Sequence, residues 1–402
     1  MDSKKKTIIW VAGLGCGVLI LGAALLGLGG YWLYRQTTTV SSTVRDAQQS
    51  LGPPKVALGK GFLTSSVFAS VPRVGAVTDI AAGRLDPRPG VSFVVAGTQG
   101  AAFLQQDGTV ASSLSFPSST AFQPHAFYER VDIADVEGDG ICEFYNRDTW
   151  AHETVLLNHD GSRRWSYKFA DAAMDDACAG DVDGDGISEF VVGYNGDGGV
   201  HLVNADGTRR WRQPSGNVWH VEIADLNGDG RAEILHTGGS SDLTVLNGNG
   251  ATLATWSSPD SRLDLSKFSL VSWPNRGGLP HVIVPGANVL GLLDGSGKLA
   301  AVFDAPQAKD FEDISATLVL LQPKAPPYLA VLLHFELAGR SILYVYDPQN
   351  KLIYRELLGE NAAALATLPL GKTGIEALLV GGEDKVYEYV IVPSAATATS
   401  SR

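Results

Sequence analysis

Cysteine and basic charge are scarce in this chain of 402 residues. The three cysteines, Cys16, Cys142 and Cys178, form no CxxC pair, which excludes a disulfide framework and the usual zinc modules. Lys and Arg number 31 against 43 Asp and Glu, giving a formal net charge of −12. A nucleic-acid-binding surface needs a basic face, so no nucleic-acid partner is expected. Cys142 and Cys178 either form one bridge in an oxidising compartment or, as we prefer, are two small buried thiols.

Catalytic motifs are also missing. The sequence has no HExxH, no GxSxG, no P-loop and no GxGxxG between a strand and a helix, and its eight histidines are scattered. We therefore predict no catalytic or organic-cofactor-binding residues and a protein that is not an enzyme.

An uncharged run from Thr7 to Tyr34 follows the basic start MDSKKK. About 20 apolar residues are enough for a helix to cross a bilayer, and Trp10, Trp32 and Tyr34 suit its interfaces. We predict a cytoplasmic N-terminus (1–6), a transmembrane signal anchor (7–34) and an extracytoplasmic body at the cell surface or in the periplasm. Cleavage as a signal peptide is the alternative.

The polar segment 35–55, which contains Pro53-Pro54, is predicted to be a flexible linker, and 393–402 a disordered tail. Between them the sequence repeats. The clearest copies are ADVEGDGICEF (134–144), GDVDGDGISEF (180–190) and ADLNGDGRAEI (224–234). An Asp-Gly or Asn-Gly turn follows each at a similar distance and precedes a strand that contains Trp165, Trp211 or Trp256. Such turns between apolar runs are hairpin signals, so each unit is a four-stranded antiparallel meander of about 45 residues.

Four further units repeat the pattern with Pro and Gly in place of the acids. They lie at 81–110, 271–303, 318–354 and 366–392. The fold class is therefore all-β, a seven-bladed β-propeller over residues 56–392. The last unit supplies only three strands, and we predict that the lone strand at 59–70 completes it and closes the ring.

The loop DVDGDGISE, Asp181–Glu189, places carboxylates at its first, third, fifth and ninth positions. A divalent cation of calcium's size takes 6–8 oxygen ligands, and this spacing supplies most of them. The loop is not an EF-hand, because position 12 is Val192 rather than Glu and its flanks are β-rich.

The three acidic loops resemble those of the FG-GAP/VCBS repeat family, whose DxDxDG loops lie in β-propellers such as the integrin α-subunit head. The resemblance implies that each loop joins the first two strands of a blade and binds Ca²⁺, up to three ions in all. The implied ligands are Asp135, Glu137, Asp139, the Ile141 carbonyl and Glu143; Asp181, Asp183, Asp185, the Ile187 carbonyl and Glu189; and Asp225, Asn227, Asp229, the Arg231 carbonyl and Glu233. With four carboxylates, the second loop is predicted to bind tightest.

The resemblance also implies a binding function, with a protein or glycan partner on one loop face. An enzyme in the central channel, either a carbohydrate-active lyase or hydrolase or a quinoprotein dehydrogenase, is the alternative, and a scaffold in an envelope complex is a third possibility. For the enzyme, the residues to inspect are His125, Tyr128, Asp175, Trp219 and His220; Asp175-Asp176 is most simply a chance pair. The three tryptophans are expected to pack between blades, and the pairs Arg163-Arg164 and Arg209-Arg210 to lie solvated on outer strands.

Overall fold

The computed structural model describes residues 45–116, 130–147, 151, 153–170, 172–239, 242–273, 278–308, 311–335, 338–371 and 374–392. The chain divides into two compact units, Met1–Pro53 and Pro54–Arg402. In the first, residues 45–51 are helical, within the predicted linker, and Lys55 in the second already begins β1. No helix among the described residues is long and apolar enough to cross a membrane. The predicted anchor at 7–34, the N-terminus 1–6 and the tail 393–402 lie outside the described residues.

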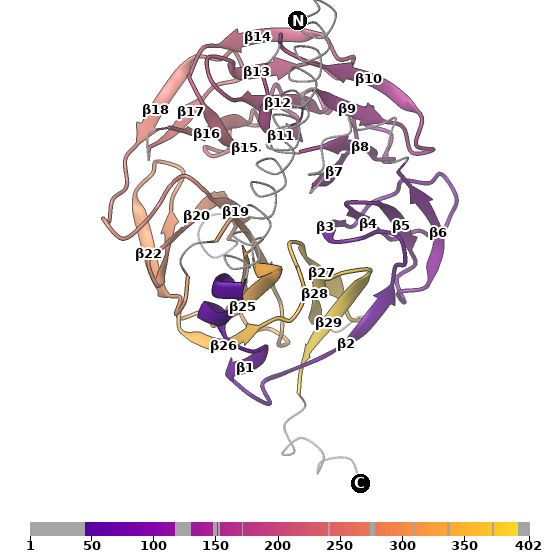
Figure 1. The fold of residues 1–402 in the computed structure, drawn as a ribbon, viewed down its shortest axis with the longest axis vertical. Coiled ribbons are helices and arrows are strands. Elements are labelled where there is room, and N and C mark those ends of the chain that lie inside the picture. Colours follow the sequence, from indigo (N-terminus) through magenta and orange to yellow (C-terminus); the bar gives the residue numbers. More distant parts are fainter. Residues whose placement is uncertain are drawn as a thin grey trace, which may run out of the picture. The chain divides into compact units, whose positions relative to one another are not determined.

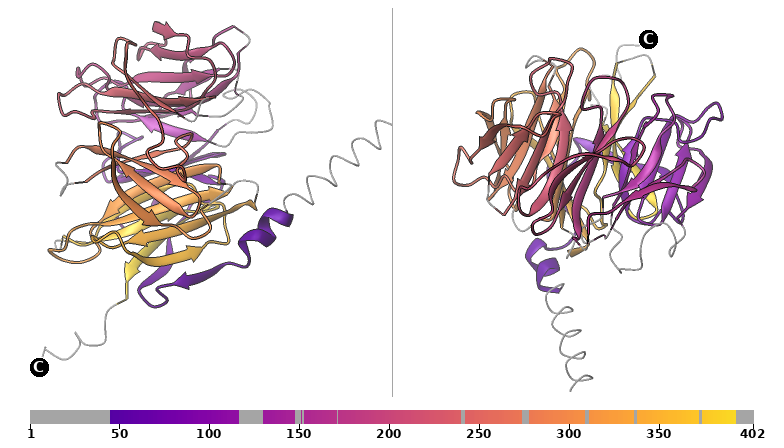
Figure 2. Two further views of the ribbon diagram at one scale, coloured as in Figure 1. Left: turned by 90° about the vertical axis from the view of Figure 1, so that its left-hand side faces the viewer. Right: turned by 90° about the horizontal axis from the view of Figure 1, so that it is seen from above.

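The second unit is a ring of seven antiparallel sheets, as the repeats predict (Figure 1; two further views in Figure 2). Blade 1 comprises β3 (Val77–Ala81), β4 (Phe93–Gly97), β5 (Gly100–Leu104) and β6 (Val110–Ser115); blade 2, β7 (Val131–Ala134), β8 (Glu143–Asn146), β9 (Thr154–Leu157) and β10 (Arg163–Tyr167); blade 3, β11 (Met174–Gly180), β12 (Glu189–Tyr194), β13 (Gly199–Val203) and β14 (Arg209–Gln213); blade 4, β15 (Val218–Ala224), β16 (Glu233–Gly238), β17 (Leu243–Leu246) and β18 (Thr252–Trp256).

Of the remaining three blades, blade 6 includes β1 and blade 7 includes β2, the two strands nearest the N-terminus. Blade 5 comprises β19 (Ser269–Ser272), β20 (Pro280–Gly286), β21 (Val289–Leu293) and β22 (Leu299–Asp304); blade 6, β23 (Asp313–Val319), β24 (Tyr328–Phe335), β25 (Arg340–Tyr346), β26 (Leu352–Leu357) and β1 (Lys55–Leu58); blade 7, β27 (Leu365–Pro369), β28 (Glu376–Gly381), β29 (Lys385–Ile391) and β2 (Leu63–Ser70). Strands β3, β7, β11, β15, β19 and β27 lie nearest the centre of the ring (Figure 1). In blade 6 the corresponding edge strand, opposite β1, is β23.

Ring closure follows the prediction. Strand β2 pairs antiparallel with β29, from Leu63 opposite Ile391 to Ser70 opposite Lys385. The earliest strand of blade 7 and the last strand of the chain therefore lie side by side, and β29 gains a partner on its outer edge (Figure 1).

The tryptophans pack between blades, as expected. Each lies against the glycine of the turn between the third and fourth strands of the next blade; the pairs are Trp165 with Gly207, Trp211 with Gly250 and Trp256 with Gly297. Gly297 has a φ of +79°, and a Cβ there would lie 2.5 Å from the indole of Trp256. Only glycine allows this approach, which explains why the turn and the aromatic residue recur together.

The two body cysteines are free, with Cys178 buried. The unbridged alternative is therefore the correct one for this pair.

His236 is the one histidine in the described residues whose two ring nitrogens are buried without a hydrogen-bond partner. It is 5% exposed on β16, beside Ile234 and Leu235 of the same strand. Burial lowers the pKa of its ring to about 4, because the charged form would lie in apolar surroundings.

We expect the substitution His236→Leu to raise the free energy of unfolding at pH 7 by about 1–2 kcal/mol, because it removes an unsatisfied polar group. The folded-state pKa lies below the unfolded value of about 6.5, so wild-type stability is present above pH 6.5 and is lost as the pH falls toward 4. Over that window the loss from this residue is about 3 kcal/mol, and the leucine variant lacks it. Urea unfolding at pH 7 and pH 5 tests this, with the exposed His159→Leu as control. Equal pH dependence in both variants would contradict it.

Candidate functional site: three acidic loops and a charged channel

The three acidic loops join the first and second strands of blades 2, 3 and 4, where the sequence predicts them. They lie next to one another: a Cβ on Gly138 would lie 3.2 Å from the carbonyl oxygen of Gly186, and one on Gly184 would lie 2.6 Å from that of Gly230. Both glycines have φ near +70° to +82°. The loops thus form one continuous acidic row, which we call the acidic-loop face.

The first aspartate of each loop organises the backbone around itself. In the second loop, Asp181 Oδ1 accepts the N–H groups of Gly184 at 2.7 Å and Asp185 at 3.2 Å, while Oδ2 accepts that of Gly186 at 2.8 Å. The equivalent bonds are made by Asp135 and by Asp225. The turn is consequently formed by the chain's own hydrogen bonds before any ion is considered.

The ninth-position glutamates are buried. Glu143, Glu189 and Glu233 are 3%, 2% and 6% exposed, and each accepts the N–H of the loop's second residue at 2.9–3.2 Å. Burial raises the pKa of all three carboxyl groups, because the charged form is desolvated. A cation near these carboxylates would offset that cost.

In the second loop three carboxylates converge. Oxygens of Asp181, Asp183 and Glu189 all lie within 4.8 Å of one another, close enough to share one ion with oxygen distances of about 2.3–2.6 Å. The fifth-position aspartates point elsewhere: Asp139, Asp185 and Asp229 each accept the N–H two residues on, at 2.8–2.9 Å. Of the predicted ligands, the first, third and ninth positions are therefore assembled in this loop, and the fifth would have to turn inward.

The arginine pairs lie exposed on the outer strands β10 and β14, as the sequence predicts, but one arginine of each pair also contacts an acidic loop. Arg210 on β14 contacts Asp183 and Glu189 of the second loop, and Arg164 on β10 contacts Glu137 and Glu143 of the first. Their neighbours behave as expected: Arg163, for example, is 43% exposed and pairs with Glu153. These contacts were not predicted, because 27 residues separate Arg210 from Asp183 along the chain and only the blade brings them together.

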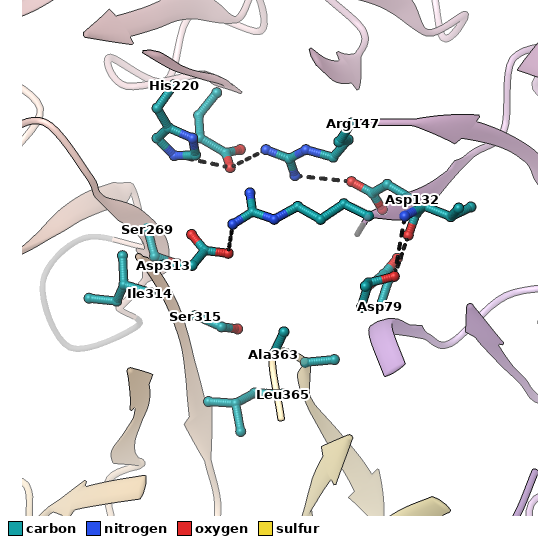
Figure 3. Close-up of a pocket in the computed structure, with 15 residues that line it drawn as sticks. Asp79, Asp132, Arg147, His220, Ser269, Asp313, Ile314, Ser315, Ala363 and Leu365 are labelled. Atoms are coloured by element: carbon teal, nitrogen blue, oxygen red, sulfur yellow. Dashed lines mark hydrogen bonds and ion pairs between the residues drawn. The ribbon is translucent and has the colours of Figure 1, made fainter. Parts of the chain in front are cut away.

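A second cluster lies in the central channel, where the first strands begin (Figure 3). A cavity of about 150 Å³ is lined there by Thr78, Asp79, Arg130, Val131, Asp132, Arg147, His220, Glu222, Ser269, Asp313, Ile314, Ser315, Ala363, Ala364 and Leu365. The register shifts at the start of β3, β11 and β15, just before Asp79, Asp176 and His220. In each of these three strands a bulge thus precedes a polar residue of the channel cluster.

Arg147 connects three blades. Its guanidinium lies 3.1 Å from Asp132 of blade 2, as Figure 3 shows, 3.1 Å from Asp176 of blade 3 and 3.3 Å from Glu222 of blade 4. Arg147 holds the pKa of Asp132 and Asp176 below the usual range despite burial. Arg130 pairs with Asp313 of blade 6. Together with the contact between Asp79 of blade 1 and Asp132 of blade 2, these charged side chains connect five of the seven blades.

His220 is held at both ring nitrogens. Nδ1 lies 2.7 Å from an Asp176 carboxylate oxygen, and Nε2 lies 3.0 Å from the carbonyl oxygen of Phe268. Both neighbours are hydrogen-bond acceptors, so each ring nitrogen is directed at a partner within the protein. With both nitrogens engaged, the ring has no lone pair directed at the cavity.

Asp79 and Asp132 form a carboxyl pair. Burial and the neighbouring Asp132 raise the pKa of Asp79 well above its usual value. Asp79 therefore keeps its proton and donates it to the Asp132 carboxylate, which Arg147 and the Tyr145 hydroxyl also contact.

The residues named above for a channel enzyme lie in different environments. Asp176 joins the Arg147 cluster, whereas Asp175, with Asn195 3.5 Å away, has a pKa that burial raises to about 6. The pair is thus split between two environments by the bulge. Trp219 is 40% exposed, and His125 and Tyr128 lie outside the described residues. The sequence analysis did not predict five charged members of the channel cluster, although charged residues within or beside apolar strands were a visible signal. They are Arg130, Asp132, Arg147, Glu222 and Asp313.

Comparison with known proteins agrees with the fold. A family model described as an FG-GAP-like repeat matches residues 181–236, from the second acidic loop through the third. The chain carries an FG-GAP-like repeat within a seven-bladed β-propeller. No curated protein sequence matches this FG-GAP-like propeller.

Solved structures resemble this chain in fold alone. A chain from the crystal structure of BBS1N in complex with ARL6DN has 13% identity and a TM-score of 0.54, over 83% of this chain and 96% of that one. A streptogramin B lyase has 12% identity and a TM-score of 0.55, over 82% and 98%. A catalytically inactive virginiamycin B lyase from Staphylococcus aureus with quinupristin has 11% identity and a TM-score of 0.54, over 82% and 99%. One such neighbour was solved with a protein partner and others are lyases, so fold likeness does not choose between binder and enzyme.

Proposed function

We propose that this protein is a calcium-stabilised propeller without catalytic activity, exported and held at the membrane by residues 7–34, which binds a protein or glycan partner on a loop face. The observation that carries the proposal is the row of three acidic loops, preorganised by their own backbone hydrogen bonds. Calcium would join the first two strands of blades 2, 3 and 4 and so stiffen one face of the ring. A rigid face suits a binding surface, because little order has to be gained when the partner docks.

The state of the channel residues supports binding over catalysis. Arg147 forms ion pairs with three carboxylates, and both ring nitrogens of His220 face hydrogen-bond acceptors. A general base needs a free lone pair within reach of its substrate, which this ring does not offer.

The channel enzyme remains the second candidate, because a cavity adjoins the Asp79–Asp132 pair, and paired carboxyl groups with one proton suit acid–base chemistry. Turnover of an oligosaccharide panel, abolished in Asp132→Asn while the calcium response is unchanged, would establish the enzyme.

We expect the melting temperature of the full chain in detergent to rise with calcium over EGTA and to change little with magnesium. Calcium that binds only the folded state at 100 times its Kd stabilises by about 2.7 kcal/mol per site. Magnesium dehydrates reluctantly and demands a smaller octahedral site. Equal melting temperatures in calcium and EGTA would remove the metal from the proposal. A pull-down from detergent-solubilised membranes, with and without EGTA, would then ask whether partner capture depends on the loops.

A further inference from the structure

An arginine from the fourth strand lies where a cation would lie in the second loop. In Arg210, Nη1 is 2.7 Å from Asp183 Oδ2 and Nη2 is 2.6 Å from Glu189 Oε1. Its Nε donates to the Asn204 side chain at 2.7 Å, which fixes the plane of the guanidinium. Two of the three carboxylates that come close enough to share an ion are thus already joined by a positive charge of the chain itself.

The first loop has the same arrangement. Arg164 contacts Glu137 at the third position of that loop, and its Nη1 is 3.5 Å from Glu143 at the ninth. Arg164 and Arg210 each stand immediately before a tryptophan on the fourth strand of their blade. The two arginines therefore occupy equivalent positions and contact equivalent carboxylates.

The third loop differs. Thr252 pairs with Leu246 as Arg209 pairs with Val203, so Leu253 holds the position of Arg210. Leu253 is 55% exposed, and among the described residues no Lys or Arg forms an ion pair with Asp225, Asp229 or Glu233. In place of a cation, the Asn227 amide donates to Glu233 at 2.9 Å.

We propose that Arg164 and Arg210 are built-in counter-ions that compete with divalent metal for the first two loops, so that the third loop, Asp225–Glu233, takes calcium at the lowest concentration. This rests on the proposed calcium function. A calcium ion entering the second loop must displace a guanidinium from Asp183 and Glu189, since both cations need the same oxygens. The second loop has four carboxylates and the third has three, but the positive charge of Arg210 offsets the additional negative charge of the second loop. The order of affinity predicted from carboxylate number is thereby reversed.

The exposed position of Leu253 allows a reciprocal exchange. Arg210→Leu makes the second loop like the third, and Leu253→Arg makes the third loop like the second. Each exchange is expected to change calcium affinity at its own loop about tenfold, upward in Arg210→Leu and downward in Leu253→Arg. Arg209→Leu is the matched control, because it removes the same charge one residue away, from a side chain that lies over the Phe169 ring.

Equilibrium dialysis of the full chain against radioactive calcium, at a free concentration between the two affinities, gives the number of bound ions directly. The expected count is about one for wild type and Arg209→Leu, about two for Arg210→Leu and about zero for Leu253→Arg. Circular dichroism and melting in EGTA show that each variant is folded. A merely structural ion pair would lower the melting temperature in Arg210→Leu without raising the count.

Different results would contradict the calcium function and the competition by arginine. If no variant binds calcium at any concentration, the calcium function itself is wrong. If calcium binds but the count is the same in Arg210→Leu, Leu253→Arg and wild type, the metal sites stand and the competition by arginine is overturned.

Discussion

Replacement of Arg147 by methionine is expected to lower the free energy of unfolding by about 3–5 kcal/mol at pH 7. The side chain is 16% exposed and neutralises Asp132, Asp176 and Glu222, of which Asp176 is only 2% exposed. Removal of one partner of a buried ion pair leaves the other charge desolvated, which costs this much in other buried pairs. Guanidinium unfolding of the full chain measures the change.

The pH dependence provides a second readout. Arg147 keeps the pKa of Asp132 and Asp176 below the unfolded value, so their contribution to stability is present above about pH 4 and is lost as the pH falls through the folded-state values. The variant lacks that contribution, and the difference from wild type should therefore shrink at acid pH.

The control is the exposed pair of Arg163 and Glu153, where Arg163→Met should cost no more than about 1 kcal/mol. A similar cost for both variants would mean that the channel cluster does not hold the blades together.

Deletion of residues 1–70, which removes β1 and β2, is expected to abolish the cooperative unfolding transition. Strand β2 makes seven registered pairs with β29, and without it blade 7 has three strands and an open outer edge. The buried side chains Leu63 and Ala69, which pack into the cores on either side of blade 7, would also be lost. An open edge of this kind pairs with other chains, so aggregation should accompany the loss.

Deletion of residues 1–58 is the matched control, because it removes β1 and leaves β2 in place. Strand β1 is a fifth strand outside blade 6 and is mostly exposed. This shorter deletion should still melt cooperatively, within a few degrees of the full chain. Thermal unfolding followed by circular dichroism distinguishes the two, and a cooperative melt for the longer deletion would show that closure is dispensable.

The repeats were enough to predict the ring, because each blade is a local meander whose turns and apolar runs are written in consecutive residues. The positions of the acidic loops and the closing strand followed from the same count. Even so, equivalent residues were misaligned in one case: Trp256 lies two positions beyond the place of Trp165 and Trp211, on the same face of its strand, as the pairing of Val245 with Ala254 shows.

The charged contacts could not be predicted in this way. Arg147, Asp176 and Glu222 are brought together by three blades whose relative placement no local pattern encodes. The contacts of Arg210 with Asp183 and Glu189 were not predicted, because they join the fourth strand of the blade to the loop between its first two strands. Bulges such as the one before Asp176 also leave little trace in hydrophobic periodicity, and yet they decide which side chain enters the channel.

The attachment of β1 has a mechanical consequence. Any tension applied through residue 54 reaches β1 before it reaches β2, because β1 precedes β2 in the chain. Strand β1 pairs with β26 at Lys55, Val56 and Leu58 only, and such a short ladder separates one pair at a time from its end. Under a pulling force, blade 6 would therefore shed this strand first and lengthen the chain between 54 and 63. The ring would remain closed while the residues before β2 absorb the first extension.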